Sequence, residues 1–147
     1  MTTKTEQVNA ELRALIKDNG MRVTSQRLAV LVALHEHAVP MTHEEVMSAL
    51  GKDGYDKASV WRVLSDFAGI GLVRRMDLGD RVWRYELYDA CRPVSDDHPH
   101  FLCEVCSEVT CLPPLEVRGR DGGFPAALVN ANFHIRISGT CARCVGP

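Results

Sequence analysis

The chain has 147 residues, an apolar content of 46% and a formal net charge of −2. This length suits one domain or two small ones, and no apolar run approaches the length of a membrane span. The slight acidity argues against a protein that binds nucleic acid over its whole surface. The first residues, Met1 to Gln7, are polar and have no hydrophobic region of a signal peptide, so we expect a cytoplasmic protein.

The charge is distributed unevenly along the chain. Residues 57–84 carry an excess of three positive charges, whereas eight acids face five arginines from Glu86 onward. Such an asymmetry predicts two modules with different partners. We place the first module in residues 1–87 and the second in residues 98–147, with a polar hinge at residues 88–97.

The first module begins with apolar side chains at helical spacing. We expect helices at residues 6–17, 25–37, 42–50 and 57–69. Thr42 and Glu45 have the spacing of a capping box, which predicts the start of the third helix. The fourth helix is expected to turn one stripe inward: Val60, Val63, Leu64 and Phe67.

The opposite face of the fourth helix presents Trp61 beside Arg62, which is unusual for a merely solvated surface. A hairpin is expected next, with strands at residues 72–76 and 81–87. Helices followed by a hairpin predict a winged helix-turn-helix, whose last helix enters the major groove while hairpin arginines contact phosphates. The alternative is a small α/β bundle with a coincidental basic edge. The candidate DNA contacts are Lys57, Ser59, Trp61, Arg62, Arg74 and Arg75.

The second module contains two C-x-x-C frames, Cys103 with Cys106 and Cys141 with Cys144. Two such pairs provide a four-sulfur shell with no open position, which is typical of a structural zinc site. A pair of disulfides is the alternative, and iron in the same shell is another. The absence of a signal peptide favours reduced thiols.

Between the two frames we expect an α/β arrangement, which makes the whole chain α+β. Residues 108–112 suit a strand, and residues 133–138 alternate as a second strand that leads to the last cysteine pair. Residues 113–132 are expected to be mostly helical, in two short pieces separated by Gly122-Gly123 and Pro125.

The order of these motifs resembles the ferric-uptake-regulator (Fur) family of metal-sensing bacterial repressors over nearly the full chain, most closely its zinc-uptake-regulator branch. The similar stretches are Arg22-Val-Thr-Ser-Gln-Arg27, Ala58-Ser-Val-Trp-Arg-Val-Leu64, His98-x-His100-x-x-Cys103-x-x-Cys106 and Gly139-x-Cys141-x-x-Cys144. The resemblance implies a DNA-binding domain, a hinge and a dimerisation domain with the four-cysteine zinc. It also implies a homodimer on double-stranded operator DNA and a regulatory metal near the hinge.

Several positions differ from the pattern of the family. Pro40 replaces the histidine usual before the third helix, and Cys111 replaces the acid usual five residues after the second cysteine. Cys91 lies close to where zinc-sensing members have a cysteine ligand. His134 is one position from the late-strand histidine of the family, so a third metal site stays open.

The resemblance matches Glu86, His98 and His100 to regulatory ligands. The complete candidate set for the regulatory metal is Glu86, Cys91, His98, His100 and Cys111. His98 and His100 are two residues apart, so they share one face of a strand and can reach one ion. Thiolate with imidazole favours zinc over iron(II). Alternatively, Cys111 is a small buried apolar residue and Glu86 forms an ion pair with Arg84.

The leading hypothesis is a zinc-responsive repressor of zinc-uptake genes, with a structural and a regulatory Zn²⁺. An iron, manganese or peroxide sensor of the same family is the alternative, although Pro40 removes the histidine that peroxide chemistry uses. A zinc-ribbon-like protein-interaction module is the alternative of another class, and it leaves Trp61 and Arg62 unexplained. We expect no enzyme, no membrane partner and no small organic substrate, because no nucleophile and base are paired.

Overall fold

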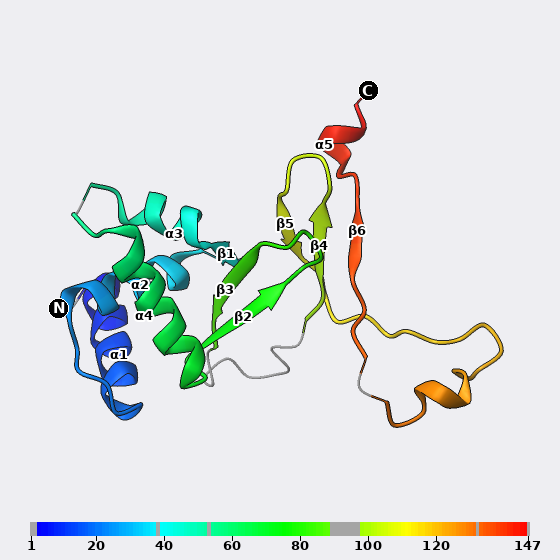
Figure 1. The fold of residues 1–147 in the computed structure, drawn as a ribbon, viewed down its shortest axis with the longest axis horizontal. Helices are drawn as coiled ribbons and strands as arrows, with labels where there is room; N and C mark the ends of the chain where they lie inside the picture. The colour runs from blue at the N-terminus through cyan, green and yellow to red at the C-terminus, as the bar shows by residue number, and fades with distance from the viewer. Residues whose placement is uncertain (1–2, 38, 53, 89–97, 132, 147) are drawn as a thin grey trace. The chain divides into compact units, whose positions relative to one another are not determined.

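The computed structural model describes residues 3–37, 39–52, 54–88, 98–131 and 133–146. The chain divides into two compact units, Met1–Pro93 and Val94–Pro147, and each is described by itself (Figure 1). Of the predicted hinge, only Tyr88 is among the described residues, so the candidate ligand Cys91 lies outside them. None of the described helices is long and apolar enough to cross a membrane.

The first unit contains the four predicted helices. They are α1 (Lys4–Asp18), α2 (Ser25–Glu36), α3 (His43–Leu50) and α4 (Lys57–Gly69). The side chains of Thr24, Thr42 and Asp56 accept backbone N–H groups at the starts of α2, α3 and α4. Glu45 completes the predicted capping box at α3, so these helix starts follow from local sequence alone.

An antiparallel sheet with the order β1-β3-β2 completes this unit. Its strands are β1 (Met41–Thr42), β2 (Val73–Asp77) and β3 (Trp83–Leu87). The predicted hairpin is confirmed, but its second strand begins at Trp83 instead of Arg81. Arg81 has a φ of 63°, and Asp80 accepts hydrogen bonds from the Val82 backbone and the Arg84 side chain. These bonds hold the residues before Trp83 in a loop.

The core of the first unit lies between the helices and one face of the sheet. The predicted inward stripe of α4 is buried: Val60, Val63, Leu64 and Phe67. Val73 and Tyr85 join the same cluster from the sheet. Gln26 donates to Ser59 across 2.6 Å, and Arg27 forms an ion pair with Asp66 at 3.6 Å, so α2 is tied to α4. These contacts orient the outer face of α4.

The second unit has a small sheet with the order β5-β4-β6. The elements are β4 (His100–Cys103), β5 (Val109–Cys111), the 3₁₀ turn η1 (Ala126–Leu128), β6 (Ile137–Gly139) and α5 (Ala142–Val145). β4 pairs with β5 antiparallel and with β6 parallel. The parallel pair brings the end of the chain beside the end of β4.

The helical prediction for residues 113–132 is wrong, since η1 is the only helical element among the described residues there. Gly122-Gly123 and Pro125 leave pieces too short to be stable helices by themselves. Side chains that would have to pack to stabilise them, such as Leu115 and Val129, are exposed. The strand predicted at residues 133–138 is shorter than expected, because pairing begins only at Ile137.

Candidate functional site

The two C-x-x-C frames are brought together in the second unit. Cys103 ends β4 and Cys106 follows it in a turn, whereas Cys141 caps α5 and Cys144 lies within it. The pairing of Cys103 with Gly139 places the second frame beside the first. The four sulfurs all lie within 4.8 Å of one another.

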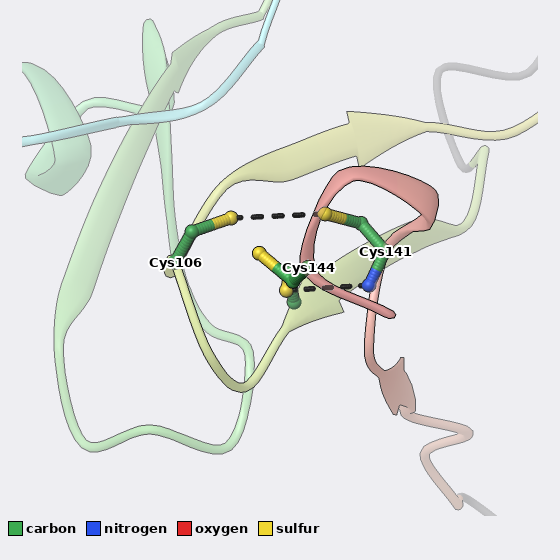
Figure 2. A group of neighbouring side chains, drawn as sticks. Cys106, Cys141 and Cys144 are labelled. Carbon is green, nitrogen blue, oxygen red and sulfur yellow. Dashed lines mark hydrogen bonds between the residues drawn. The ribbon is translucent and has the colours of Figure 1, made fainter. Parts of the chain in front are cut away.

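The arrangement of the sulfurs fits a tetrahedral metal ion. Figure 2 shows the side chains of Cys106, Cys141 and Cys144 converging, and the Cys106 and Cys141 sulfurs are 3.9 Å apart. A tetrahedral shell with Zn–S bonds of about 2.3 Å requires sulfurs about 3.8 Å apart. The described cysteines are free thiols, and none of them forms a disulfide.

The protonation of these thiols is set by their neighbours. Backbone N–H groups of Cys106 and Cys141 lower the pKa of the Cys103 thiol to about 6, and the Cys141 N–H donates to the Cys103 sulfur across 3.4 Å. Hydrogen bonds to the sulfurs of Cys141 and Cys106 raise the pKa of the Cys144 thiol to about 12. The lowered pKa of Cys103 favours its thiolate, and a metal must displace thiol protons as it binds.

Contacts around the sulfurs tie the two frames to each other. The Glu104 N–H donates to the Gly139 carbonyl across 2.8 Å, and the Ser138 hydroxyl donates to the Glu104 carboxylate across 2.7 Å. Arg143 forms an ion pair with Glu108. Four cysteines fill a tetrahedral shell and leave no position for a substrate, so the site can hold a structural metal.

A second group of metal-ligating side chains lies on β4 and β5. His100 is paired directly with Cys111 across the antiparallel strands, so their side chains share a face of the sheet. His98 precedes His100 by two residues, and the ring centroids of the two histidines are 4.6 Å apart. One nitrogen of each ring and the Cys111 sulfur all lie within 4.8 Å of one another. We call these three residues the His-Cys cluster.

The other two candidate regulatory ligands are not in the second unit's described residues. Glu86 lies on β3 of the first unit, where it is paired with Arg74 of β2. Cys91 lies outside the described residues. The His-Cys cluster by itself offers two imidazoles and one thiol, which is one donor fewer than a tetrahedral ion takes.

The predicted DNA contacts divide into exposed and internally bonded side chains. On α4, Lys57 and Arg62 are exposed, and Trp61 is 54% exposed. The Ser59 hydroxyl instead accepts a hydrogen bond from Gln26 and donates to the Asp56 carbonyl across 3.0 Å. Ser59 therefore helps to fix the start of α4 within the first unit.

The two candidate arginines of the hairpin point to opposite faces of β2, because they are neighbours in a strand. The Arg74 guanidinium lies 5.4 Å from the centroid of the Tyr88 ring, whereas that of Arg75 lies 4.3 Å from the centroid of the Trp83 ring. Trp83 is not among the sequence-predicted contacts. It alternates with Tyr85 and Leu87, a pattern that indicates a core-facing side chain, yet it is 50% exposed.

The description of the protein-family model that matches residues 18–121 is "Ferric uptake regulator family". Among curated proteins, the chain is 33% identical over 100 residues to the ferric uptake regulation protein of Neisseria gonorrhoeae, covering 66% of each chain. The chain thus spans slightly less than two thirds of that relative. It is 28% identical over 133 residues to the peroxide operon regulator of Bacillus subtilis, covering 88% of each.

Solved structures share the fold. The ferric uptake regulator from Pseudomonas aeruginosa with manganese is 29% identical, with a TM-score of 0.56 over 70% of this chain and 75% of that one. The Helicobacter pylori ferric uptake regulator, with three functional metal binding sites, is 20% identical, with a TM-score of 0.69 over 100% and 99%. A zinc uptake regulator complexed with zinc and DNA is 20% identical, with a TM-score of 0.58 over 98% and 97%.

Proposed function

The chain belongs to the ferric uptake regulator family, and on that premise we propose that it is a metal-responsive repressor that binds operator DNA as a homodimer. In this proposal the four cysteines hold a structural zinc, and a second zinc is the effector. Zinc then controls the genes of zinc uptake. In this proposal the residues of the metal sites and of the DNA-binding surface have binding roles, and none is catalytic.

The observation that supports zinc as the effector is the thiol in the His-Cys cluster. Cys111 lies beside two imidazoles on one face of β4 and β5. Thiolate and imidazole ligands select zinc over manganese or iron(II), which take more oxygen ligands. Pro40, where the family pattern has a histidine, is buried in the first unit and offers no ligand. The donor set thus favours zinc sensing over iron or peroxide sensing.

Glu86 and Cys91 are the proposed remaining ligands of the regulatory ion. Both precede the second unit in sequence, so an ion that also binds the His-Cys cluster restricts how the DNA-binding unit is held. Metal acts in this scheme by population shift, because it binds the DNA-competent arrangement more tightly than the others. The two recognition helices of a dimer must match successive major grooves, about 34–36 Å apart.

The outer face of α4 is the proposed recognition surface. Lys57, Trp61 and Arg62 are exposed along one side of the helix, while its other side is buried in the core. Apolar side chains exposed in the second unit are available to a partner protomer in the proposed homodimer. They are Leu115, Val117, Phe124, Val129, Phe133 and Ile135.

The test begins with operator selection. Zinc-loaded protein selects binding sites from a random duplex library, and fluorescence anisotropy then measures affinity for the selected duplex at buffered zinc, iron(II) and manganese(II) concentrations. We expect zinc to induce binding of the wild type at a lower free metal concentration than iron(II) or manganese(II) does. A response to iron(II) or manganese(II) at lower free concentrations would favour the alternative sensors. If the protein bound no duplex, with or without zinc, the result would favour the protein-interaction module.

The decisive variant is His98→Ala with His100→Ala. It should remain a folded dimer with its four-cysteine zinc, yet lose the zinc response. The matched control is His134→Ala, an exposed histidine of the same unit outside the cluster. If the double variant kept a wild-type zinc response, the His-Cys cluster would not be the sensor. A loss of the response in His134→Ala would implicate the third metal site.

A further inference from the structure

The tip of the β2–β3 hairpin carries an aromatic and an arginine that the recognition helix does not account for. Trp83 begins β3 and is 50% exposed. The Arg75 guanidinium lies over its ring, 4.3 Å from the centroid. The face of the indole attracts the guanidinium, and this contact restricts the orientation of the charge.

The register of the hairpin shows which face this pair occupies. Arg75 is paired with Tyr85, and Trp83 is paired with Asp77, so all four side chains are on one face. Tyr85 on that face belongs to the core shared with α4. Arg75 and Trp83 therefore lie on the helix-facing side of the hairpin. The tip of the hairpin projects beyond α2 and α4 (Figure 1).

The tip is held in one conformation by its own hydrogen bonds. The Asp80 carboxylate accepts two bonds from the Arg84 guanidinium, at 2.9 and 2.8 Å. The Asp77 carboxylate, on the same face as Arg75, accepts the Gly79 N–H across 2.7 Å and so closes the turn. Both acids nearest the tip are thus engaged in the turn, and a fixed tip costs less ordering entropy on binding.

We propose that Arg75, supported by the Trp83 ring, is a minor-groove reader that selects A·T-rich duplex beside the site read by α4. This inference rests on the proposed function. A narrow A·T-rich minor groove has an enhanced negative potential that attracts an inserted arginine. Arginine suits this position better than lysine, because guanidinium is more weakly hydrated and stacks on aromatic rings.

The chemistry of the minor groove allows a selective test. Inosine·cytosine pairs lack the guanine amino group in the minor groove but keep the major-groove pattern of G·C pairs. We compare three duplexes with the same selected centre and with flanks of A·T, G·C or I·C pairs. The wild type should bind the A·T and I·C flanks about five- to tenfold more tightly than the G·C flank, the low end of a single base-pair discrimination.

Two variants separate reading from simple charge or hairpin stability. Arg75→Lys keeps the charge, and Trp83→Leu keeps an apolar side chain. Each should reduce the flank preference to less than about twofold. Arg136→Lys, an exposed arginine of the second unit outside the candidate DNA contacts, is the matched control and should keep the preference. Urea unfolding of each variant checks that the substitution in the hairpin leaves the stability of the protein unchanged.

Several results would overturn the inference. A wild type that bound all three duplexes equally would refute it and leave the proposed function intact. Equal weakening on all flanks in Arg75→Lys would mean a phosphate contact, and so would refute it too. If the wild type bound no duplex in a zinc-dependent manner, the proposed function itself would fall.

Discussion

Two residues of α4, Arg62 and Leu64, should report separately on DNA binding and on folding. They are two positions apart, so they point to different sides of the helix. Leu64 is 0% exposed and belongs to the core cluster of the first unit, whereas Arg62 is exposed. The perturbations are Leu64→Ala and Arg62→Ala.

The expected magnitudes follow from burial. Replacing a fully buried leucine by alanine costs about 2–5 kcal/mol, so Leu64→Ala should lower the free energy of unfolding by about 3 kcal/mol. With a urea m-value of about 2 kcal/mol/M, the unfolding midpoint should fall by about 1.5 M. Arg62→Ala should change stability by less than about 0.5 kcal/mol, since exposed positions tolerate substitution.

DNA binding should show the opposite order. Arg62→Ala should weaken binding to the selected operator by about 1–3 kcal/mol if the side chain reads a base edge. Equal losses on all sequences, with a shallower salt dependence, would indicate a phosphate contact instead. Urea titration followed by circular dichroism and fluorescence anisotropy measure the two quantities, and Arg136→Ala, an exposed arginine of the second unit, is the control.

Either of two results would contradict these roles of the two faces of α4. If Arg62→Ala were as destabilising as Leu64→Ala, α4 would not present that face to solvent. If Arg62→Ala left operator binding unchanged in affinity and in salt dependence, α4 would not be the recognition helix.

Cys103→Ser should lose the tightly held zinc and the dimer together, measured by metal analysis and sedimentation; a variant that remained a zinc-loaded dimer would contradict the four-cysteine assignment. The hydrogen bond from Arg84 lowers the pKa of Asp80, so this pair should stabilise the hairpin above about pH 4 and lose that contribution as the pH falls through the lowered pKa. Asp80→Asn should remove this acid dependence, which tryptophan fluorescence during an acid titration would detect. Gly51 has a φ of 66°, so Gly51→Ala should lower the free energy of unfolding by about 1 kcal/mol in urea titrations, and no change would contradict the backbone conformation at the end of α3.

Local signals in the sequence were sufficient for the helices of the first unit. The capping residues Thr42 and Glu45 and the apolar spacing of α4 act over three or four positions, and the structure has both as predicted. The C-x-x-C frames are equally local, since each pair fits one turn. Their repetition indicated a four-sulfur site before any fold was known, and the structure brings the four sulfurs together.

Residues 113–132 and β1 show where local signals fail. The pattern of residues 113–132 was compatible with short helices, but short helices need packing partners to be stable. Among the residues of this range that the structure describes, η1 is the only helical element. β1 has two residues, Met41 and Thr42, too few for any alternation to be recognised. It exists because Met41 and Thr42 meet Tyr85 and Arg84 of β3, a pairing between residues far apart in the chain.

The amino-acid sequence by itself determined which side chains can bind metal or DNA, because donor chemistry and short-range spacing are properties of the residues. Only the tertiary structure decided which of them meet. Cys111 lies opposite His100 because of the register of β4 and β5, and a shift of one residue would turn it to the other face. Trp83 is exposed because the hairpin extends beyond the helices that cover Tyr85 on the same face. Register and coverage depend on contacts between distant segments, which periodicity along one segment does not contain.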